Sequence, residues 1–233
     1  MNSQNSHIWQ KGQSMFEFHA TLPFLMPIIL VTMMMIVQWG FIYTSKSTLD
    51  AATVQAVRAG TLHHGSVAEI RKGLAQGMMP LFAQGTAATD TVTAVVRSTI
   101  ATQLQSQIRI LNPDNRTFTK FRVRSRTPRG FIYEIPNNNL MYRNTRSENV
   151  GSGSHNRRLN IQDANLLQIE IRWCQRLIVP FANRVINEIV TNPWLVRPTQ
   201  DQLACNALGA ATGDIYLALT SQGLMRMQTP FRM

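Results

Sequence analysis

A long run of apolar residues without charges lies near the N-terminus. From Phe18 to Ser45 the chain has no Asp, Glu, Lys or Arg, and residues 22–43 read LPFLMPIILVTMMMIVQWGFIY. As a helix with a rise of about 1.5 Å per residue, this stretch spans roughly 33 Å, enough for a bilayer core of about 30 Å. A cleaved secretory signal would have a shorter apolar run, followed by a small-residue cleavage site. The pattern therefore predicts one transmembrane helix.

Two prolines and a group of interfacial residues refine this prediction. Pro23 and Pro27 lie inside the apolar run, and each removes one helical hydrogen bond, so we expect a kink or a locally unwound turn there. Trp39, Tyr43 and Lys46 are typical of a membrane–water interface at the far end. The basic residues on the two sides do not determine the orientation.

Beyond Tyr43 the helical spacing of apolar residues continues to Gly60, so the membrane helix is expected to extend into a stalk. Ser66 and Glu69 have the spacing of a capping box, which predicts a helix near 67–79. A longer amphipathic helix is predicted to end at Asn112–Pro113, with its apolar stripe packed on a sheet. The stripe consists of Val92, Val95, Val96, Thr99, Ile100, Leu104, Ile108 and Leu111.

Alternating apolar and polar residues predict antiparallel strands in the second half of the chain, at residues 117–126, 130–135, 166–173 and 214–221. A short helix is expected at 180–191. The predicted fold is α+β, with a single N-terminal transmembrane helix extended into a long stalk helix, then helices packed on an antiparallel β-sheet. The predicted regions are a short leader (1–12), a transmembrane and stalk helix (13–60), a helical segment (61–112) and an antiparallel β-rich extracytoplasmic region (113–233) with an exposed loop (136–160).

The chain is strongly basic. It has 23 Lys and Arg against 12 Asp and Glu, and residues 106–184 hold 14 of the former and 5 of the latter. In a strand, alternate residues share one face about 6.8 Å apart. Four basic residues at alternate positions of a predicted strand would therefore form a basic stripe on one face. This stripe either binds an anionic partner, namely DNA, a polysaccharide or an acidic subunit surface, or is a solvated face that discourages edge aggregation. No nucleic-acid-binding motif accompanies it. The stripe consists of Lys120, Arg122, Arg124 and Arg126.

The sequence offers little for cofactor chemistry or catalysis. Cys174 and Cys205 are either a disulfide pair, in an oxidising compartment, or two small buried apolar residues. His63 and His64 lack a third ligand at usable spacing, so we predict no metal site and no cofactor. Nucleophile-elbow, phosphate-loop, zinc-protease and dinucleotide motifs are absent, so we do not expect an enzyme.

The residues just before the apolar run read KGQSMFEFHATLP, from position 11 to 23. The carboxylate of Glu17 is costly to place next to hydrocarbon, although it could lie among headgroups, stabilised by the helix dipole. The segment resembles the processing site of type IV prepilins, in which a peptidase cuts after a glycine and leaves glutamate as the fifth mature residue. The resemblance implies Lys11 as the preceding basic residue, cleavage between Gly12 and Gln13, and pairing of Glu17 with the free amine of a neighbouring subunit.

Residues 12–60 resemble the N-terminal region of the TadE-like family of tight-adherence pilus proteins, and residues 163–186 and 226–230 also look like segments of that family. His19, Gln38 and Pro27 depart from the family pattern. In addition to Glu17, the resemblance implies assembly roles for Phe18 and Pro23. The matching positions are Gly12, Glu17, Phe18, Leu22, Pro23 and Val57–Gly60.

The resemblance implies a membrane-anchored minor pilin or pseudopilin of a tight-adherence type IV pilus or secretion apparatus, acting by subunit assembly through its N-terminal helix. Its partners would be a prepilin peptidase, other pilin-like subunits and tight-adherence assembly proteins. It would lie in a bacterial inner membrane, with its C-terminal domain extracytoplasmic, or enter a surface pilus. Two alternatives remain open: a non-polymerising envelope anchor whose basic β domain binds an anionic polymer, and an envelope enzyme.

Overall fold

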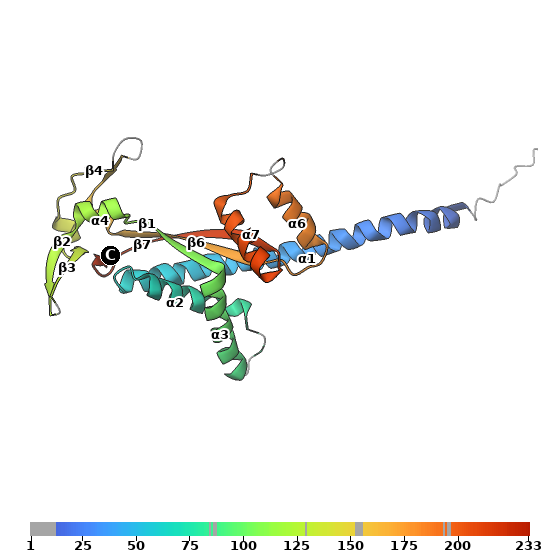
Figure 1. Cartoon of the computed structure of the whole chain (residues 1–233), viewed down its shortest axis with the longest axis horizontal. Coiled ribbons are helices and arrows are strands. Elements are labelled where there is room, and N and C mark those ends of the chain that lie inside the picture. Colours follow the sequence, from blue (N-terminus) through green and yellow to red (C-terminus); the bar gives the residue numbers. More distant parts are fainter. Residues whose placement is uncertain are drawn as a thin grey trace, which may run out of the picture.

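The computed structural model describes residues 13–83, 85, 88–128, 130–151, 156–192, 194 and 197–233, and only the backbone at 13–18, 20 and 88. The described chain begins with one helix of 50 residues, α1 (Gln13–Leu62), about 75 Å long (Figure 1). Pro23 and Pro27 lie inside this helix without interrupting it, so the expected unwound turn is not found. The predicted continuation of the membrane helix beyond Tyr43, to about residue 60, is confirmed.

The two halves of α1 have different surroundings. Between residues 21 and 37 its side chains are mostly exposed, whereas from Gln38 onward one face is buried in the rest of the protein. The buried positions recur at helical spacing, as expected for one helix face. They include Gln38, Ser45, Leu49, Ala52 and Ala56. The second half of α1 is therefore part of the core, while the first half projects from it (Figure 1).

Helix α2 (Val67–Met78), which continues into the short 3-10 helix η1 (Met79–Leu81), packs along the buried half of α1. Gly77 permits a close approach, because a Cβ atom there would lie 2.5 Å from Cα of Ala52. Ser66 does precede α2, but its side chain makes no capping hydrogen bond, so the predicted capping box is wrong. Its carbonyl accepts a hydrogen bond from the Ile70 amide instead.

The third helix, α3 (Ala88–Gln105), is shorter than predicted, because residues 106–112 form strand β1 (Ser106–Asn112). Ile108 and Leu111 fit the helical stripe, but the pairing of β1 with a distant strand overrides the local pattern. The predicted packing of the stripe on a sheet is also wrong. The buried residues of α3 are the small Ala94, Ser98, Ala101 and Thr102, and the exposed ones include Val92, Val95, Val96, Ile100 and Leu104.

Within the described residues the strands form antiparallel sheets. The first has the order β1-β6-β7, with β6 (Leu166–Arg176) in the centre and β7 (Tyr216–Arg226) beside it. Its apolar face packs on α1 and contributes buried Ile169, Ile171 and Trp173 to the core. Because β1 belongs to this sheet, the predicted boundary at residue 112 divides one structural unit. The fold is α+β, with helices packed against antiparallel sheets, as predicted.

The second sheet consists of β2 (Val123–Thr127), β3 (Gly130–Ile135) and β8 (Phe231–Arg232). The strand predicted at 117–126 is wrong in its first half, which forms helix α4 (Asn115–Phe121). Asp114 caps this helix by accepting a hydrogen bond of 2.8 Å from the Thr117 amide, which favours helix over strand.

The predicted loop at 136–160 also contains regular structure. It includes the 3-10 helix η2 (Leu140–Tyr142) and a pair of strands, β4 (Glu148–Val150) and β5 (Arg157–Leu159). Leu140 and Val150 are buried, so these described parts do not form a fully exposed loop. The remaining helices are α5 (Ile161–Ala164), α6 (Ala182–Thr191) and α7 (Gln200–Thr212).

Candidate functional site

The predicted processing segment lies at the start of α1. Lys11 and Gly12 lie outside the described residues, while Gln13, Glu17 and Phe18 belong to the first turns of the helix. Pro23, two turns farther on, is exposed. The described part of this segment is at the end of α1 that projects away from the folded domain (Figure 1).

The projecting half of α1 is apolar on all sides. Its exposed side chains include Phe24, Leu25, Ile28, Leu30, Met33 and Ile36. Among the described helices, α1 is the one long and apolar enough to cross a membrane. An apolar surface of this extent is too costly to leave in water, so the half-helix requires a lipid or protein environment.

Gln38 marks the point where the domain first covers α1. Its side chain is fully buried, and its Oε1 atom accepts a hydrogen bond of 2.9 Å from the Val179 amide. Gln38 departs from the apolar pattern of this stretch, and in the structure it joins α1 to the segment before α6. Phe18 to Val37 comprise 20 residues, or about 30 Å of helix, which is a full bilayer core.

A polar pair follows on the domain side of this point. Lys46 donates hydrogen bonds to the Asp50 carboxylate and, at 2.7 Å, to the Thr220 carbonyl of β7. Burial alone would raise the pKa of the Asp50 carboxyl, but hydrogen bonds with Lys46 and Ser221 hold that pKa below its usual value. The Asp50 carboxyl is therefore ionised at neutral pH, and its contact with Lys46 suits a watery environment beyond the apolar half.

The four basic residues predicted on one strand are distributed over three structural settings. Lys120 lies on α4 and forms an ion pair of 2.9 Å with Glu148. Arg122 ends α4, and only Arg124 and Arg126 lie on β2. The predicted four-residue strand face is therefore wrong, because α4 occupies the first part of the segment.

The structure instead combines three of these arginines with two aromatic residues of β3. Arg124 pairs across the strands with Tyr133, and Arg126 pairs with Phe131. The guanidinium carbon of Arg122 lies 4.7 Å from the Tyr133 ring centre, and that of Arg124 lies 3.9 Å from the Phe131 ring centre. We call this surface the arginine–aromatic face; it comprises Arg122, Arg124, Arg126, Phe131 and Tyr133.

The arginine–aromatic face is open to solvent. Phe131 is 60% exposed and Tyr133 is 50% exposed, although both are large side chains. Cation–π contacts hold the guanidinium groups of Arg122 and Arg124 over these two rings. The N–H edge of a guanidinium group can bind an anion through two parallel hydrogen bonds. The two aromatic residues were not among the predicted site residues, although the alternation in residues 130–135 already places Phe131 and Tyr133 on one side of a strand.

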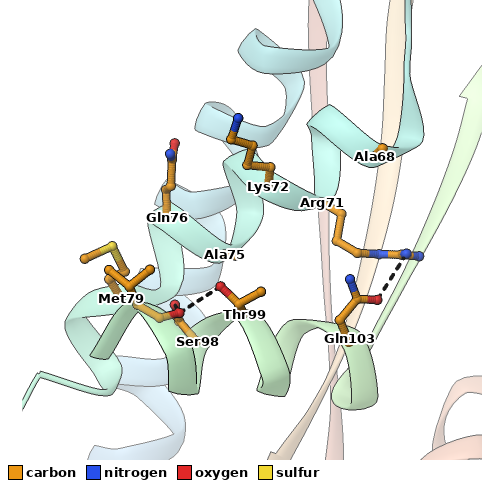
Figure 2. Close-up of a pocket in the computed structure, with 10 residues that line it drawn as sticks. Ala68, Arg71, Lys72, Ala75, Gln76, Met79, Ser98, Thr99 and Gln103 are labelled. Carbon is orange, nitrogen blue, oxygen red and sulfur yellow. Dashed lines mark hydrogen bonds between the residues drawn. The ribbon is translucent and has the colours of Figure 1, made fainter. Parts of the chain in front are cut away.

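A separate cleft of about 350 Å³ opens between α2 and α3 (Figure 2). Arg71 reaches across it to donate a hydrogen bond of 3.2 Å to Gln103. The hydroxyl groups of Ser98 and Thr99 both donate to the Val95 carbonyl, so neither is poised as a nucleophile. The described lining residues include no carboxylate, and thus no acid–base pair.

The remaining candidate residues have structural roles. Cys174 of β6 and Cys205 of α7 form the expected disulfide, with Cα atoms 5.5 Å apart. His63 and His64 each place Nδ1 within hydrogen-bonding distance of a backbone carbonyl, those of Ala59 and Pro230. In the described part of the chain, no three His, Cys, Asp or Glu side chains lie together as a metal site would require.

Comparisons of the chain with known protein families, curated proteins and solved structures find no match. The function is therefore inferred from the chain itself. Its two most unusual surfaces are the projecting apolar half of α1 and the arginine–aromatic face.

Proposed function

We propose that this protein is a membrane-anchored, pilin-like subunit, a minor pilin or pseudopilin, of a tight-adherence type IV pilus or secretion apparatus. It is cleaved after Gly12 and acts by assembly rather than by catalysis. The observation that carries the proposal is the division of α1, whose first half is an exposed apolar helix and whose second half is part of the domain core. A helix of this form anchors a subunit in lipid and can exchange lipid for the helices of its neighbours.

Assembly would be driven by packing of the apolar half-helices. In a packed bundle, the carboxylate of Glu17 would lie beside the free amine of Gln13 on a neighbouring subunit. Burying either charge alone is costly, whereas burying them as a pair removes most of that cost. The exposed apolar residues of α3, such as Val92, Val96 and Ile100, supply a further surface for contact between subunits.

The proposed location is a bacterial inner membrane, with the domain on its extracytoplasmic side. The disulfide between Cys174 and Cys205 supports this side, because disulfides form and persist in oxidising compartments. Incorporation into a surface pilus and retention in the membrane are both compatible with this orientation.

Cleavage by a prepilin peptidase tests the proposal directly. We expect co-expression with the peptidase to yield a membrane-extracted chain whose intact mass begins at Gln13, because the enzyme cuts after Gly12. Gly12→Ala should retain the 12-residue leader under the same conditions. Gly40→Ala is the matched control, since a Cβ atom there meets nothing within 4 Å, and it should be cleaved like the parent. A parent chain that keeps Met1 with active peptidase present would overturn the proposal.

A second function, binding of an anionic polymer by a non-polymerising envelope anchor, is favoured by the arginine–aromatic face. Arg124 and Arg126 lie at alternate positions of β2, about 6.8 Å apart, and Arg122 directly precedes the strand. This arrangement suits a row of phosphate or sulfate groups. Its exposed rings add surfaces for stacking bases, a usual feature of single-strand binding.

Replacing Arg122 and Arg124 by Gln together should weaken binding of a fluorescent oligothymidylate at least about tenfold in an anisotropy titration. The slope of log K against log salt should also become shallower by about 1.4, because two phosphate contacts are lost. Arg58→Gln with Arg97→Gln removes the same charge from exposed positions elsewhere and should preserve most of the binding. Equal loss in both double variants would indicate attraction by net charge alone. A sulfated polysaccharide in place of the oligonucleotide distinguishes the two polymer classes.

A further inference from the structure

Helix α6 lies where the apolar half of α1 meets the domain. The segment leading into α6 contacts α1 through the hydrogen bond between Val179 and Gln38, and α6 itself also contacts α1. Figure 1 shows α6 on the side of the domain that faces the apolar end of α1. If the apolar half spans a bilayer, α6 lies at the surface of that bilayer.

Two faces of α6 are apolar, and only one of them is covered. Ala182 and Ile186 are buried against the domain. Val185 and Ile189 are four residues apart, so they lie along one line of the helix, and Phe181 directly precedes the first turn; all three side chains are exposed. Neighbouring Ile178 and Trp194 are exposed as well, at 64% and 94%. We call these five residues the α6 apolar edge.

The depth of the α6 apolar edge follows from the geometry of α1. A hydrocarbon core of about 30 Å takes up the 20 residues from Phe18 to Val37, so Gln38 lies at the boundary with the headgroups. Val179 is hydrogen-bonded to Gln38 and therefore lies at the same depth. Exposed Trp39 and Tyr43 of α1, residue types that favour this interfacial zone, follow directly.

The charges beside the edge are consistent with this position. Arg184 and Glu188 are exposed on the line next to Phe181 and Val185, so α6 presents apolar and charged residues side by side. This is the arrangement of helices that lie in the membrane interface with the apolar side turned into the acyl boundary. No charged residue lies within the edge itself.

We propose that the α6 apolar edge inserts into the headgroup–acyl boundary of the membrane that α1 spans. The proposal rests on the membrane anchoring assigned to α1 above. The domain then has two lipid contacts, the spanning helix and α6, and these fix its tilt relative to the bilayer. The edge contacts lipid rather than another protein, because it lies beside the end of the apolar half of α1 that is nearest the domain.

Quenching of tryptophan fluorescence by brominated lipid tests this. The full chain is reconstituted into vesicles of phosphatidylethanolamine and phosphatidylglycerol at three to one, with acyl chains plain or brominated near the headgroup. For Val185→Trp, we expect bromination to reduce the added emission about twofold or more, because the indole would lie in the boundary region. Val92→Trp, a change at an exposed valine of α3, is the matched control and should lose almost none.

Phe24→Trp, an exposed position within the apolar half of α1, separates the two proposals by reporting on lipid brominated along the acyl chains. If Phe24→Trp is quenched while Val185→Trp behaves like Val92→Trp, α1 is anchored and the α6 proposal is wrong. If Phe24→Trp is not quenched, membrane anchoring fails and the α6 proposal fails with it. Near-ultraviolet circular dichroism of each variant verifies that the domain is folded.

Discussion

Replacing Glu17 by Gln is expected to abolish self-association of the processed chain while leaving it anchored and cleaved. In the proposed assembly the carboxylate neutralises the Gln13 amine of a neighbour, and Gln has nearly the same shape without the charge. Breaking a buried ion pair by removing one partner costs about 3 to 5 kcal/mol. At about 1.4 kcal/mol per factor of ten, co-purification of tagged and untagged copies from membranes should fall more than about a hundredfold.

Glu69→Gln is the matched control for this experiment. Glu69 lies on α2 and forms a loose surface pair of 3.9 Å with Lys72, and such pairs contribute about 0 to 1 kcal/mol. This variant should co-purify like the parent. Undiminished association of the Glu17→Gln chain would mean that the apolar half-helices pack without a charge pair. Loss of cleavage in that variant would assign Glu17 to recognition by the peptidase instead.

The second large effect is expected for Gly77→Leu, at the contact between α2 and α1. A Cβ atom at this position would lie 2.5 Å from Cα of Ala52, which is backbone and cannot move aside alone. The two helices must separate, and overpacking of this kind costs about 3 kcal/mol. For a chain of this size, the midpoint of thermal unfolding should fall by roughly 6 to 12 °C.

Thermal unfolding is followed by near-ultraviolet circular dichroism of the full chain in detergent, which reports on the packed domain. Gly40→Leu carries the same substitution to an exposed position of α1, where a Cβ atom meets nothing within 4 Å. It should leave the midpoint nearly unchanged. If Gly77→Leu unfolds at the temperature of the parent, α2 does not pack on α1 as described.

Sequence patterns predicted those elements whose formation depends on residues close together in the chain. The apolar half of α1 and its membrane-spanning length are readable from residues 18–45, because both the bilayer dimension and the helical rise are known in advance. Strand β1 was not predicted, because it is stabilised by pairing with a strand that is distant in the sequence. Ile108 fits the end of a helical stripe, and only its pairing with Ile171 of β6 shows that it lies in a strand. The alternation of Gln107, Ile108, Arg109 and Ile110 is a strand signal too short to outweigh the helical stripe that runs into it.

Three other differences between prediction and structure concern residues of the candidate site. Asp114, directly after a proline, is a helix-start signal that could have placed Lys120 on α4 rather than on a strand. The role of Gln38 could not be anticipated, because its partner is the backbone amide of Val179, 141 residues away. The aromatic half of the arginine–aromatic face was visible as alternation, but its pairing with the arginines depends on the register of β2 with β3.

The continuity of α1 couples rotation in the apolar half to rotation of the domain. Because one unbroken helix serves both, the two parts share an axis and a helical phase, and neither can turn about that axis by itself. A shift in contact by one helix position, about 100°, turns the whole domain by the same angle. The way neighbouring half-helices fit together would therefore determine which domain surface points outward, including the direction in which the arginine–aromatic face is presented.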